Sequence, residues 1–200
     1  MRIPYTFGRF IYGLIAVNVV VFFIQRNFPV TSYYLAMIPA LVREGFLWQF
    51  VTYMFAHGGF SHILFNMLGL YIFGFQVERE MGSYEFLLYY LATGIFAGIA
   101  SFAVYVAMGT EAALLGASGA LFAVELAFAA YFPDAVVYIF GIVPVRAPVL
   151  VLGYTALELF FSVTGMRAGV AHMTHLFGFA AGWLYLMARF RINPWKSFFR

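Results

Sequence analysis

Residues 84–106 read YEFLLYYLATGIFAGIASFAVYV, an apolar run whose only formal charge is Glu85. An α-helix rises about 1.5 Å per residue, and a hydrocarbon core of about 30 Å therefore needs about 20 mostly apolar residues. The run is long enough, and it predicts a transmembrane helix. The segments on either side of it can be judged by the same measure.

The composition of the whole chain agrees with a membrane protein. Apolar residues make up 64% of the 200 residues, charged residues make up 10%, and the mean hydropathy is +0.92. A soluble globular chain is about 45–50% apolar and about 25% charged. So few charges exclude a soluble enzyme, a nucleic-acid-binding protein and a disordered chain. The sequence contains no Cys, which excludes thiolate nucleophiles and Cys-ligated metal sites.

Five further segments predict membrane-spanning helices, which gives an all-α protein with six transmembrane helices. The expected spans are residues 10–24, 61–77, 84–106, 118–132, 148–163 and 170–188. The stretch between the first two is broken by charges and prolines but is too apolar for a solvated loop, so it predicts short helices in the membrane interface. Without an internal repeat or boundary, residues 1–200 are expected to form a single domain.

The distribution of Lys and Arg predicts the orientation of the chain. Six spans place both termini on one side, and the basic residues expected there are Arg2, Arg9, Arg79, Arg146, Arg189, Arg191, Lys196 and Arg200. The opposite side has only Arg26, Arg43 and Arg167. Both termini are therefore expected in the cytoplasm. The first apolar run lacks a small-residue cleavage site, which favours a retained span over a signal peptide.

Polar side chains inside predicted spans are costly and need a reason. The candidates are His62 and Asn66 on the second span, Ser118 at the start of the fourth, His172 and His175 near the start of the sixth, and Glu125 and Glu158 inside the fourth and fifth. Spans two, four and six all begin on the non-cytoplasmic side. The polar residues near these three starts are therefore expected at similar depth, where they can converge.

Each candidate also has a structural interpretation. Small residues in Gly116-Ala117-Ser118-Gly119 can serve close helix packing, although backbone N–H groups at a helix start can also bind an oxyanion. Asn66 can be a helix–helix hydrogen-bonder or an oxyanion donor. The spacing His175-x2-Gly178-x3-Gly182 predicts close approach to a neighbouring span. If that neighbour is the fourth span, the imidazole meets the Ser118 hydroxyl.

The remaining polar residues are expected to act structurally. His172 is interpreted as a solvated residue at the mouth of the site, and His57 as ordering the turn before the second span. Glu125 and Glu158 are interpreted as neutral or hydrogen-bonded structural groups. The single Asp, Asp134, follows the fourth span on the opposite side from Ser118. No acid is therefore expected to orient His175, and a slow Ser–His dyad is predicted.

The motifs together resemble the rhomboid intramembrane serine proteases over nearly the whole chain. They are His62-Ile63-Leu64-Phe65-Asn66, Gly116-Ala117-Ser118-Gly119, His175-Leu176-Phe177-Gly178 with Gly182, and Glu78-Arg79-x-x-Gly82. The resemblance implies a partly embedded first loop, Ser118 as the nucleophile and His175 as general base and acid. It also implies an oxyanion site made by Asn66, His62 and the backbone N–H of Ser118.

The resemblance further implies single-span membrane proteins as substrates, cut in or near the transmembrane segment, with the lipid bilayer as surroundings and no metal, cofactor or nucleic acid. A prokaryotic plasma membrane is expected, with the site toward the non-cytoplasmic side. The sequence departs from the family pattern at Trp48-Gln49, where Trp-Arg is frequent, and at Phe122, where a Tyr often stacks under the catalytic His.

Two alternatives remain open. The first is a non-catalytic rhomboid-like protein that binds helices, although such relatives usually lack the serine or the histidine. The second is a His-ligated membrane metalloenzyme, because imidazoles suit zinc. It is disfavoured by the expectation that no carboxylate lies at the depth of the histidines.

Overall fold

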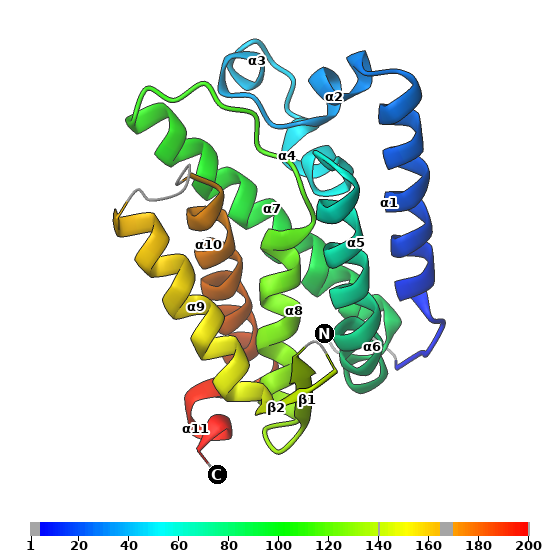
Figure 1. The fold of residues 1–200 in the computed structure, drawn as a ribbon, viewed down its shortest axis with the longest axis vertical. Helices are drawn as coiled ribbons and strands as arrows, with labels where there is room; N and C mark the ends of the chain where they lie inside the picture. The colour runs from blue at the N-terminus through cyan, green and yellow to red at the C-terminus, as the bar shows by residue number, and fades with distance from the viewer. Residues whose placement is uncertain (1–4, 140, 165–169, 200) are drawn as a thin grey trace.

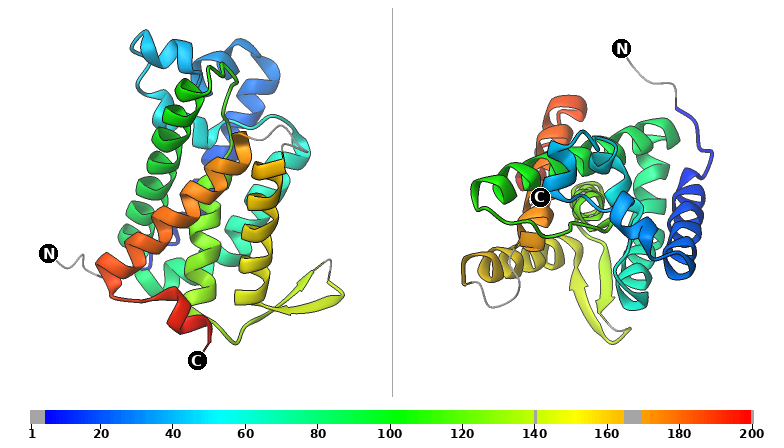
Figure 2. Two further views of the ribbon diagram at one scale, coloured as in Figure 1. Left: turned by 90° about the vertical axis from the view of Figure 1, so that its left-hand side faces the viewer. Right: turned by 90° about the horizontal axis from the view of Figure 1, so that it is seen from above.

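The computed structural model describes residues 5–139, 141–164 and 170–199. These residues form a helical bundle around a central helix, α8 (Ser118–Tyr131). The helices packed against α8 include α5 (Phe60–Gly69), α7 (Ser83–Ala107), α9 (Ala147–Thr164) and α10 (Val170–Tyr185). Figure 1 shows the bundle from the side, and the view from above in Figure 2 shows α8 end-on in its middle. The outermost helix, α1 (Phe10–Asn27), packs against α5.

Helices occur at all six positions where the sequence predicts a span. Four of them are long and apolar enough to cross a membrane: α1, the continuous run Phe60–Met81, α7 and α9. That run consists of α5, a π-helical segment η2 (Leu70–Gly74) and α6 (Phe75–Met81). The other two helices, α8 and α10, are shorter. Helix α10 continues through a second π-helical segment, η3 (Leu186–Phe190), toward α11 (Pro194–Phe198). The count of six crossings stays a prediction.

The central position of α8 follows from its sequence, SGALFAVELAFAAY. A helix that is apolar all round is stable where every face is covered, and ten of its 14 residues are buried. The loop between α7 and α8 descends into the bundle, so α8 begins below the level at which α7 ends (Figure 1). Pro133 follows the helix and cannot continue it. The first residue of α8, Ser118, is therefore placed inside the bundle.

A buried carboxylate fastens the start of α1. Glu78 is fully buried and accepts the backbone N–H groups of Phe10 at 2.6 Å and Ile11 at 3.0 Å, together with the hydroxyl of Ser83. N–H groups in the first turn of a helix have no intrahelical partner, and they carry the positive end of the helix dipole. Glu78, which belongs to the charged motif at the end of the second predicted span, thus caps the start of α1.

The segment between α1 and α5 forms short helices, as predicted. They are α2 (Val30–Leu35), α3 (Pro39–Arg43), α4 (Gln49–Thr52) and the 3₁₀ turn η1 (Tyr53–Phe55). The buried Gln49 side chain joins them, because its oxygen accepts the N–H of Ile38 at 3.0 Å and its nitrogen donates to the carbonyl of Tyr33 at 3.1 Å. Gln49 thus has a structural role at the position where the family often has Arg.

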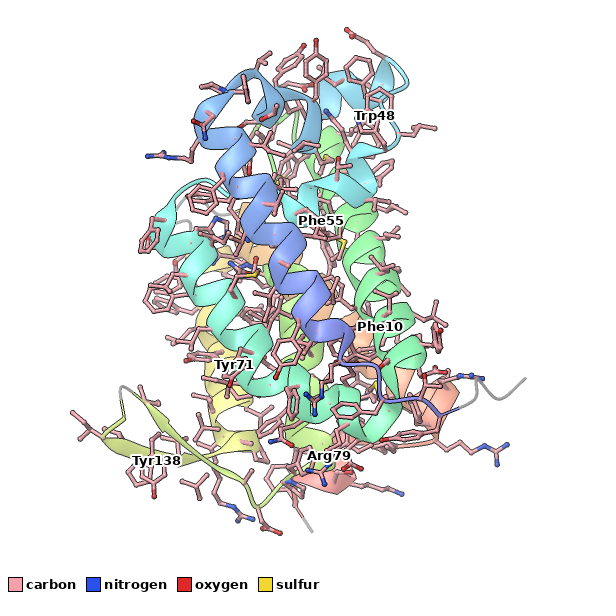
Figure 3. All side chains as sticks on the ribbon, turned by 90° about the vertical axis from the view of Figure 1, so that its right-hand side faces the viewer. Phe10, Trp48, Phe55, Tyr71, Arg79 and Tyr138 are labelled. Atoms are coloured by element: carbon pink, nitrogen blue, oxygen red, sulfur yellow. The ribbon has the colours of Figure 1, made fainter. Side chains whose placement is uncertain are left out.

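The structure corrects the all-α expectation in one place. After α8, β1 (Val136–Ile139) and β2 (Val143–Arg146) pair as an antiparallel hairpin, with Val136 opposite Arg146. The sequence VVYI consists of β-branched and aromatic residues that favour a strand. Gly141, with φ +72°, supplies a turn conformation that residues with a Cβ rarely adopt. Figure 3 shows Tyr138 of this hairpin and Arg79 at the end of the molecule opposite Trp48.

Candidate active site

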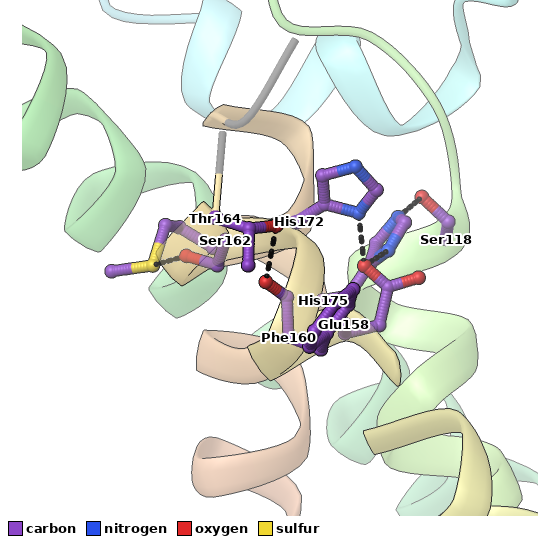
Figure 4. Close-up of polar contacts among 8 residues, drawn as sticks. Ser118, Glu158, Phe160, Ser162, Thr164, His172 and His175 are labelled. Atoms are coloured by element: carbon purple, nitrogen blue, oxygen red, sulfur yellow. Dashed lines mark hydrogen bonds and ion pairs between the residues drawn. The ribbon is translucent and has the colours of Figure 1, made fainter. Parts of the chain in front are cut away.

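Two of the residues singled out from the sequence are in direct contact. The Nε2 atom of His175 lies 2.7 Å from the Oγ atom of Ser118, although the two residues are 57 positions apart (Figure 4). This is a hydrogen-bond distance. Ser118 is the first residue of α8, and His175 lies in the second turn of α10. Both are half-buried, so the pair is partly shielded from solvent.

Glycines allow the two helices to approach this closely. A Cβ atom built at Gly178 would lie 1.9 Å from the carbonyl oxygen of Gly119, and one at Gly182 would lie 2.8 Å from the Cβ of Ala123. Only glycine fits where the backbones of α8 and α10 touch, as the spacing after His175 predicts. A contact of 2.7 Å between the hydroxyls of Ser101 and Thr174 also joins α7 to α10.

An aromatic ring fixes the plane of the imidazole. Phe122 lies one turn after Ser118 on α8, and its ring stacks on that of His175 with 4.6 Å between centroids and 8° between planes. A ring that stacks face to face limits rotation of its neighbour. Phe122 therefore provides the stacking surface without the hydroxyl that Tyr would carry.

His62 and Asn66 lie on α5 and line the same cavity as Ser118 and His175, a space of about 1020 Å³. The Asn66 side-chain nitrogen donates to the His62 carbonyl at 2.8 Å, and an amide nitrogen carries a second N–H. A Cβ atom at Gly116 would lie 2.7 Å from His62 Nε2, and Gly116 has φ +123°. Glycine is thus required both for the turn into α8 and for space beside the His62 ring.

His57 orders the turn before α5, in agreement with its interpretation from the sequence. It is buried, its backbone N–H donates to the side-chain oxygen of Gln25 at 3.0 Å, and its ring lies edge-on to His62 with 5.1 Å between centroids. Burial and, to a lesser degree, the neighbouring His62 lower the pKa of His57 to about 4. The ring is therefore neutral at pH 7.

Glu158 on α9 is the residue whose contact with His175 the sequence did not predict. Its Oε2 atom is hydrogen-bonded to Nδ1 of His172 and lies 3.1 Å from Nδ1 of His175 (Figure 4). The expectation that no carboxylate shares the depth of the histidines is therefore wrong. The interpretation of His172 as a solvated residue is wrong too, because its side chain is 14% exposed and paired with Glu158.

A simple count could have found this contact. Glu158 lies six residues before the end of α9 at Thr164, and His175 lies five residues after the start of α10 at Val170. At about 1.5 Å per residue, both lie about 8–9 Å below the same end of the bundle. Glu158, His172 and His175 each offer one possible ligand atom, and these three atoms lie within 4.8 Å of one another. Nitrogen and oxygen donors of this kind also suit zinc.

Two further acids considered from the sequence, Glu125 and Asp134, lie further from Ser118 along α8. Glu125 is half-buried and lines the cavity two turns further along α8 than Ser118. Asp134 pairs with Arg146 beside the hairpin, at the opposite end of α8 from Ser118. Of the acids that the sequence placed near or within spans, Glu158 is thus the one that approaches His175 in the described part of the chain.

The fold and the site define a class: a multi-pass helical membrane protein that holds a serine–histidine pair in a cavity of its bundle. The chain belongs to the rhomboid family, since residues 44–192 match the rhomboid domain. It is 37% identical over 125 residues to the rhomboid protease GluP of Bacillus subtilis (strain 168), covering 58% of this chain and 25% of GluP.

Two further relatives place the chain among rhomboid proteins of different origin. The rhomboid protease AarA of Providencia stuartii is 26% identical over 202 aligned residues, which cover 88% of this chain and 70% of AarA. Rhomboid-like protein 11, chloroplastic, of Arabidopsis thaliana is 43% identical over 75 residues, or 38% of this chain and 26% of that protein. The chain thus matches only about a quarter of the length of GluP.

Proposed function

We propose that this chain is an intramembrane serine endopeptidase that uses Ser118 as nucleophile and His175 as general base and acid. The observation that carries the proposal is the 2.7 Å contact between His175 Nε2 and Ser118 Oγ inside the bundle. Nε2 accepts the hydroxyl proton as Oγ attacks the peptide carbonyl, and then returns the proton to the departing amine. In the second half of the reaction Nε2 accepts a proton from the water that attacks the acyl carbonyl and returns it to Oγ as the acyl–serine bond breaks.

The oxyanion of the tetrahedral intermediate is stabilised by donors around Ser118. Asn66 offers an amide N–H from α5, and His62 lies beside it in the same cavity. The first N–H groups of α8 add to them, because the first helical hydrogen bond found there runs from Leu121 to the carbonyl of Ala117. Preorganised donors at such a position are a large contribution to acyl-transfer catalysis.

The substrates we propose are single-span membrane proteins. The cavity extends from the serine along apolar residues of α5, η2, α9 and the hairpin, which are Phe65, Leu68, Ile72, Leu150, Tyr154 and Val137. An apolar segment fits such a surface. A transmembrane helix hides its own carbonyl groups in hydrogen bonds, so cleavage requires local unwinding, and helix-breaking residues in the substrate favour it. The relatives GluP and AarA are both rhomboid proteases by name, which supports this activity.

The placement in the membrane belongs to the same proposal. It comprises six crossings in a single domain, a partly embedded first loop, cytoplasmic termini and a site toward the non-cytoplasmic side of a prokaryotic plasma membrane. Three of the basic residues counted for this orientation, Arg2, Arg167 and Arg200, lie outside the described residues. The remaining count still favours cytoplasmic termini.

One observation favours a second candidate, the metalloenzyme. The cluster of Glu158, His172 and His175 supplies the carboxylate that the sequence reasoning denied to a metal site. A serine protease mechanism accounts for more of the site, because it uses both the contact of His175 Nε2 with Ser118 and the hydrogen-bond donors Asn66 and His62 in the same cavity. A chelator that abolishes cleavage while fluorophosphonate labelling of the serine persists would favour the metalloenzyme.

The proposal is tested by cleavage of a fluorescent single-span reporter in proteoliposomes. Ser118→Ala and His175→Ala are expected to reduce cleavage to background, because each removes a partner of the proton transfer. Ser61→Ala, at the exposed start of α5, is the matched control and should cut at the wild-type rate. Cleavage by Ser118→Ala at the wild-type rate contradicts the proposal.

A further inference from the structure

We infer that Glu158 is a positioning residue for the catalytic histidine: its carboxylate holds the His175 imidazole from the side opposite Ser118, and His172 holds the carboxylate. The inference rests on the proposed function and deepens it. It replaces the Ser–His dyad expected from the sequence with a linked series, Ser118–His175–Glu158–His172, contributed by α8, α9 and α10. Figure 4 shows this series of contacts.

The position of the carboxylate is the first argument. Oε2 of Glu158 lies 3.1 Å from Nδ1 of His175, and the two side chains are 17% and 19% exposed. Among the described residues, Nδ1 of His175 is buried without an aligned hydrogen bond. A buried donor left unpaired is destabilising, and Glu158 is the group within ion-pair distance. Catalytic hydrogen bonds often align only once substrate is bound.

The tautomer of His175 is the second argument. To accept the Ser118 proton, Nε2 must be unprotonated, and the ring hydrogen of the neutral imidazole must then lie on Nδ1. An ionised carboxylate only accepts hydrogen bonds, so Glu158 beside Nδ1 stabilises this tautomer. The same negative charge stabilises the imidazolium that forms when Nε2 takes up the serine proton. The carboxylate itself neither gains nor loses a proton in the step.

The role of His172 follows from its contact with the same oxygen atom. Its Nδ1 is hydrogen-bonded to Oε2 of Glu158, and one carboxylate oxygen can accept two N–H groups. His172 and His175 lie three residues apart on α10, so their side chains are on one face of the helix. His172 thereby keeps Glu158, which lies on a different helix, next to His175. The contact of Ser162 with the sulfur of Met173, at 2.8 Å, also joins α9 to α10 nearby.

The experiment measures reporter cleavage as separate kcat and KM values, together with the rate of fluorophosphonate labelling in detergent. Glu158→Gln is expected to lower kcat and the labelling rate about 100-fold with KM unchanged. This is less than the roughly 10⁴-fold loss on removing the acid of a soluble triad, because Phe122 still stacks on the ring. Glu158→Asp keeps the charge and should recover part of the loss. Glu80→Gln, exposed on α6, is the matched control.

A second pair of variants tests His172 and keeps the inference falsifiable if Glu158→Gln does not fold. The side-chain nitrogen of Asn can replace Nδ1 of His as a donor, whereas Ala cannot. His172→Ala should therefore label more slowly than His172→Asn, and equal rates would overturn the inference. A purely structural role would lower the unfolding temperature of the variants without lowering kcat.

Three outcomes separate this inference from the proposed function. If wild type labels, Ser118→Ala does not, and Glu158→Gln labels within about twofold of wild type, only the inference fails. If Ser118→Ala labels like wild type, the proposed function fails as well. One zinc ion bound per chain, lost in both Glu158→Gln and His172→Ala, would make the cluster a metal site and overturn the positioning role.

Discussion

The His175 imidazole has a different neighbour on each part of its ring. Ser118 contacts Nε2, Glu158 approaches Nδ1, and Phe122 stacks on one face. A general base needs a fixed orientation and tautomer to accept a proton efficiently, and these three contacts together specify both. The individual contributions can be measured by substitutions that remove one neighbour at a time.

The stacked ring is expected to contribute modestly. Phe122→Ala should lower the cleavage rate about 2- to 10-fold, because an aromatic pair is worth about 0.5–1.5 kcal/mol beyond burial. Phe122→Tyr keeps the ring and should cut faster than Phe122→Ala. Reporter cleavage at saturating substrate provides the measurement. Equal rates for the two variants would show that the ring does not orient His175.

The oxyanion donor is expected to contribute more. Asn66→Ala should lower kcat about 10²- to 10³-fold, the usual cost of one lost donor. Asn66→Asp should be equally slow, because an ionised carboxylate offers no N–H. Both variants should unfold near the wild-type temperature, since the side-chain bond to the His62 carbonyl lies within α5. A kcat near wild type for Asn66→Ala would assign the oxyanion to other donors.

The sequence predicted some of these residues and not others for a physical reason. Ser118, His175, Asn66 and His62 could be found because each is a polar group near the start of a span on the same side. Glu158 approaches that side from a span that begins at the opposite end, so its depth appears only when residues are counted back from the end of the helix. Stacking by Phe122 was implied by the resemblance to the family, in which a Tyr often occupies this position.

At the scale of elements, the site depends on the contact between α8 and α10. Neither helix meets the length for a spanning helix among the described residues, and α8 lies in the middle of the bundle, packed most extensively against α10. Their close packing at Gly119 and Gly178 sets the distance between Ser118 and His175. A change in this packing should therefore affect both the activity and the stability of the protein.

A single methyl group tests this dependence. Gly178→Ala would place Cβ 1.9 Å from the Gly119 carbonyl oxygen, which is backbone and cannot rotate away. Overpacking of this kind costs about 1–3 kcal/mol, so reporter cleavage and the unfolding temperature should both fall. Gly153→Ala is the control, because a Cβ there meets nothing within 4 Å. Wild-type cleavage by Gly178→Ala would contradict the assigned packing.

The helices themselves were predictable, but the hairpin was not. Long apolar runs identify spans reliably because the bilayer fixes their length. Residues 136–146 are too short and too mixed for such a test, and a strand pair depends on cross-strand contacts such as Val137 opposite Val145, for which the bilayer sets no length. Gly141 was the one local signal of a turn.

At the scale of the whole molecule, the two ends differ in content. The short helices α2, α3 and α4 and the descending loop lie at one end, and the hairpin and α11 lie at the other (Figures 1 and 2). A pair between Arg43 and Glu111 joins the first loop to the segment after α7. A bidentate ion pair, in which Arg189 donates two hydrogen bonds of 2.9 Å to the carboxylate of Glu85, joins η3 to α7 at the other end. The proposed orientation puts the second end in the cytoplasm.

The lack of Cys makes the orientation easy to test. Met108→Cys and Ile142→Cys introduce single thiols at residues that are 66% and 78% exposed, at opposite ends of the bundle. A membrane-impermeant maleimide should label Met108→Cys in intact cells and Ile142→Cys only after permeabilisation. The opposite pattern would reverse the orientation, and labelling of both in intact cells would contradict the membrane arrangement.

The central claim is that Ser118 is activated by His175. Its most direct test is labelling of the purified protein with a fluorophosphonate in detergent, followed by mass spectrometry of the modified peptide. If His175 activates Ser118, the wild-type protein carries one label per chain, on Ser118, and neither Ser118→Ala nor His175→Ala is labelled. Modification at another residue, or a His175→Ala protein that labels as fast as wild type, would contradict it.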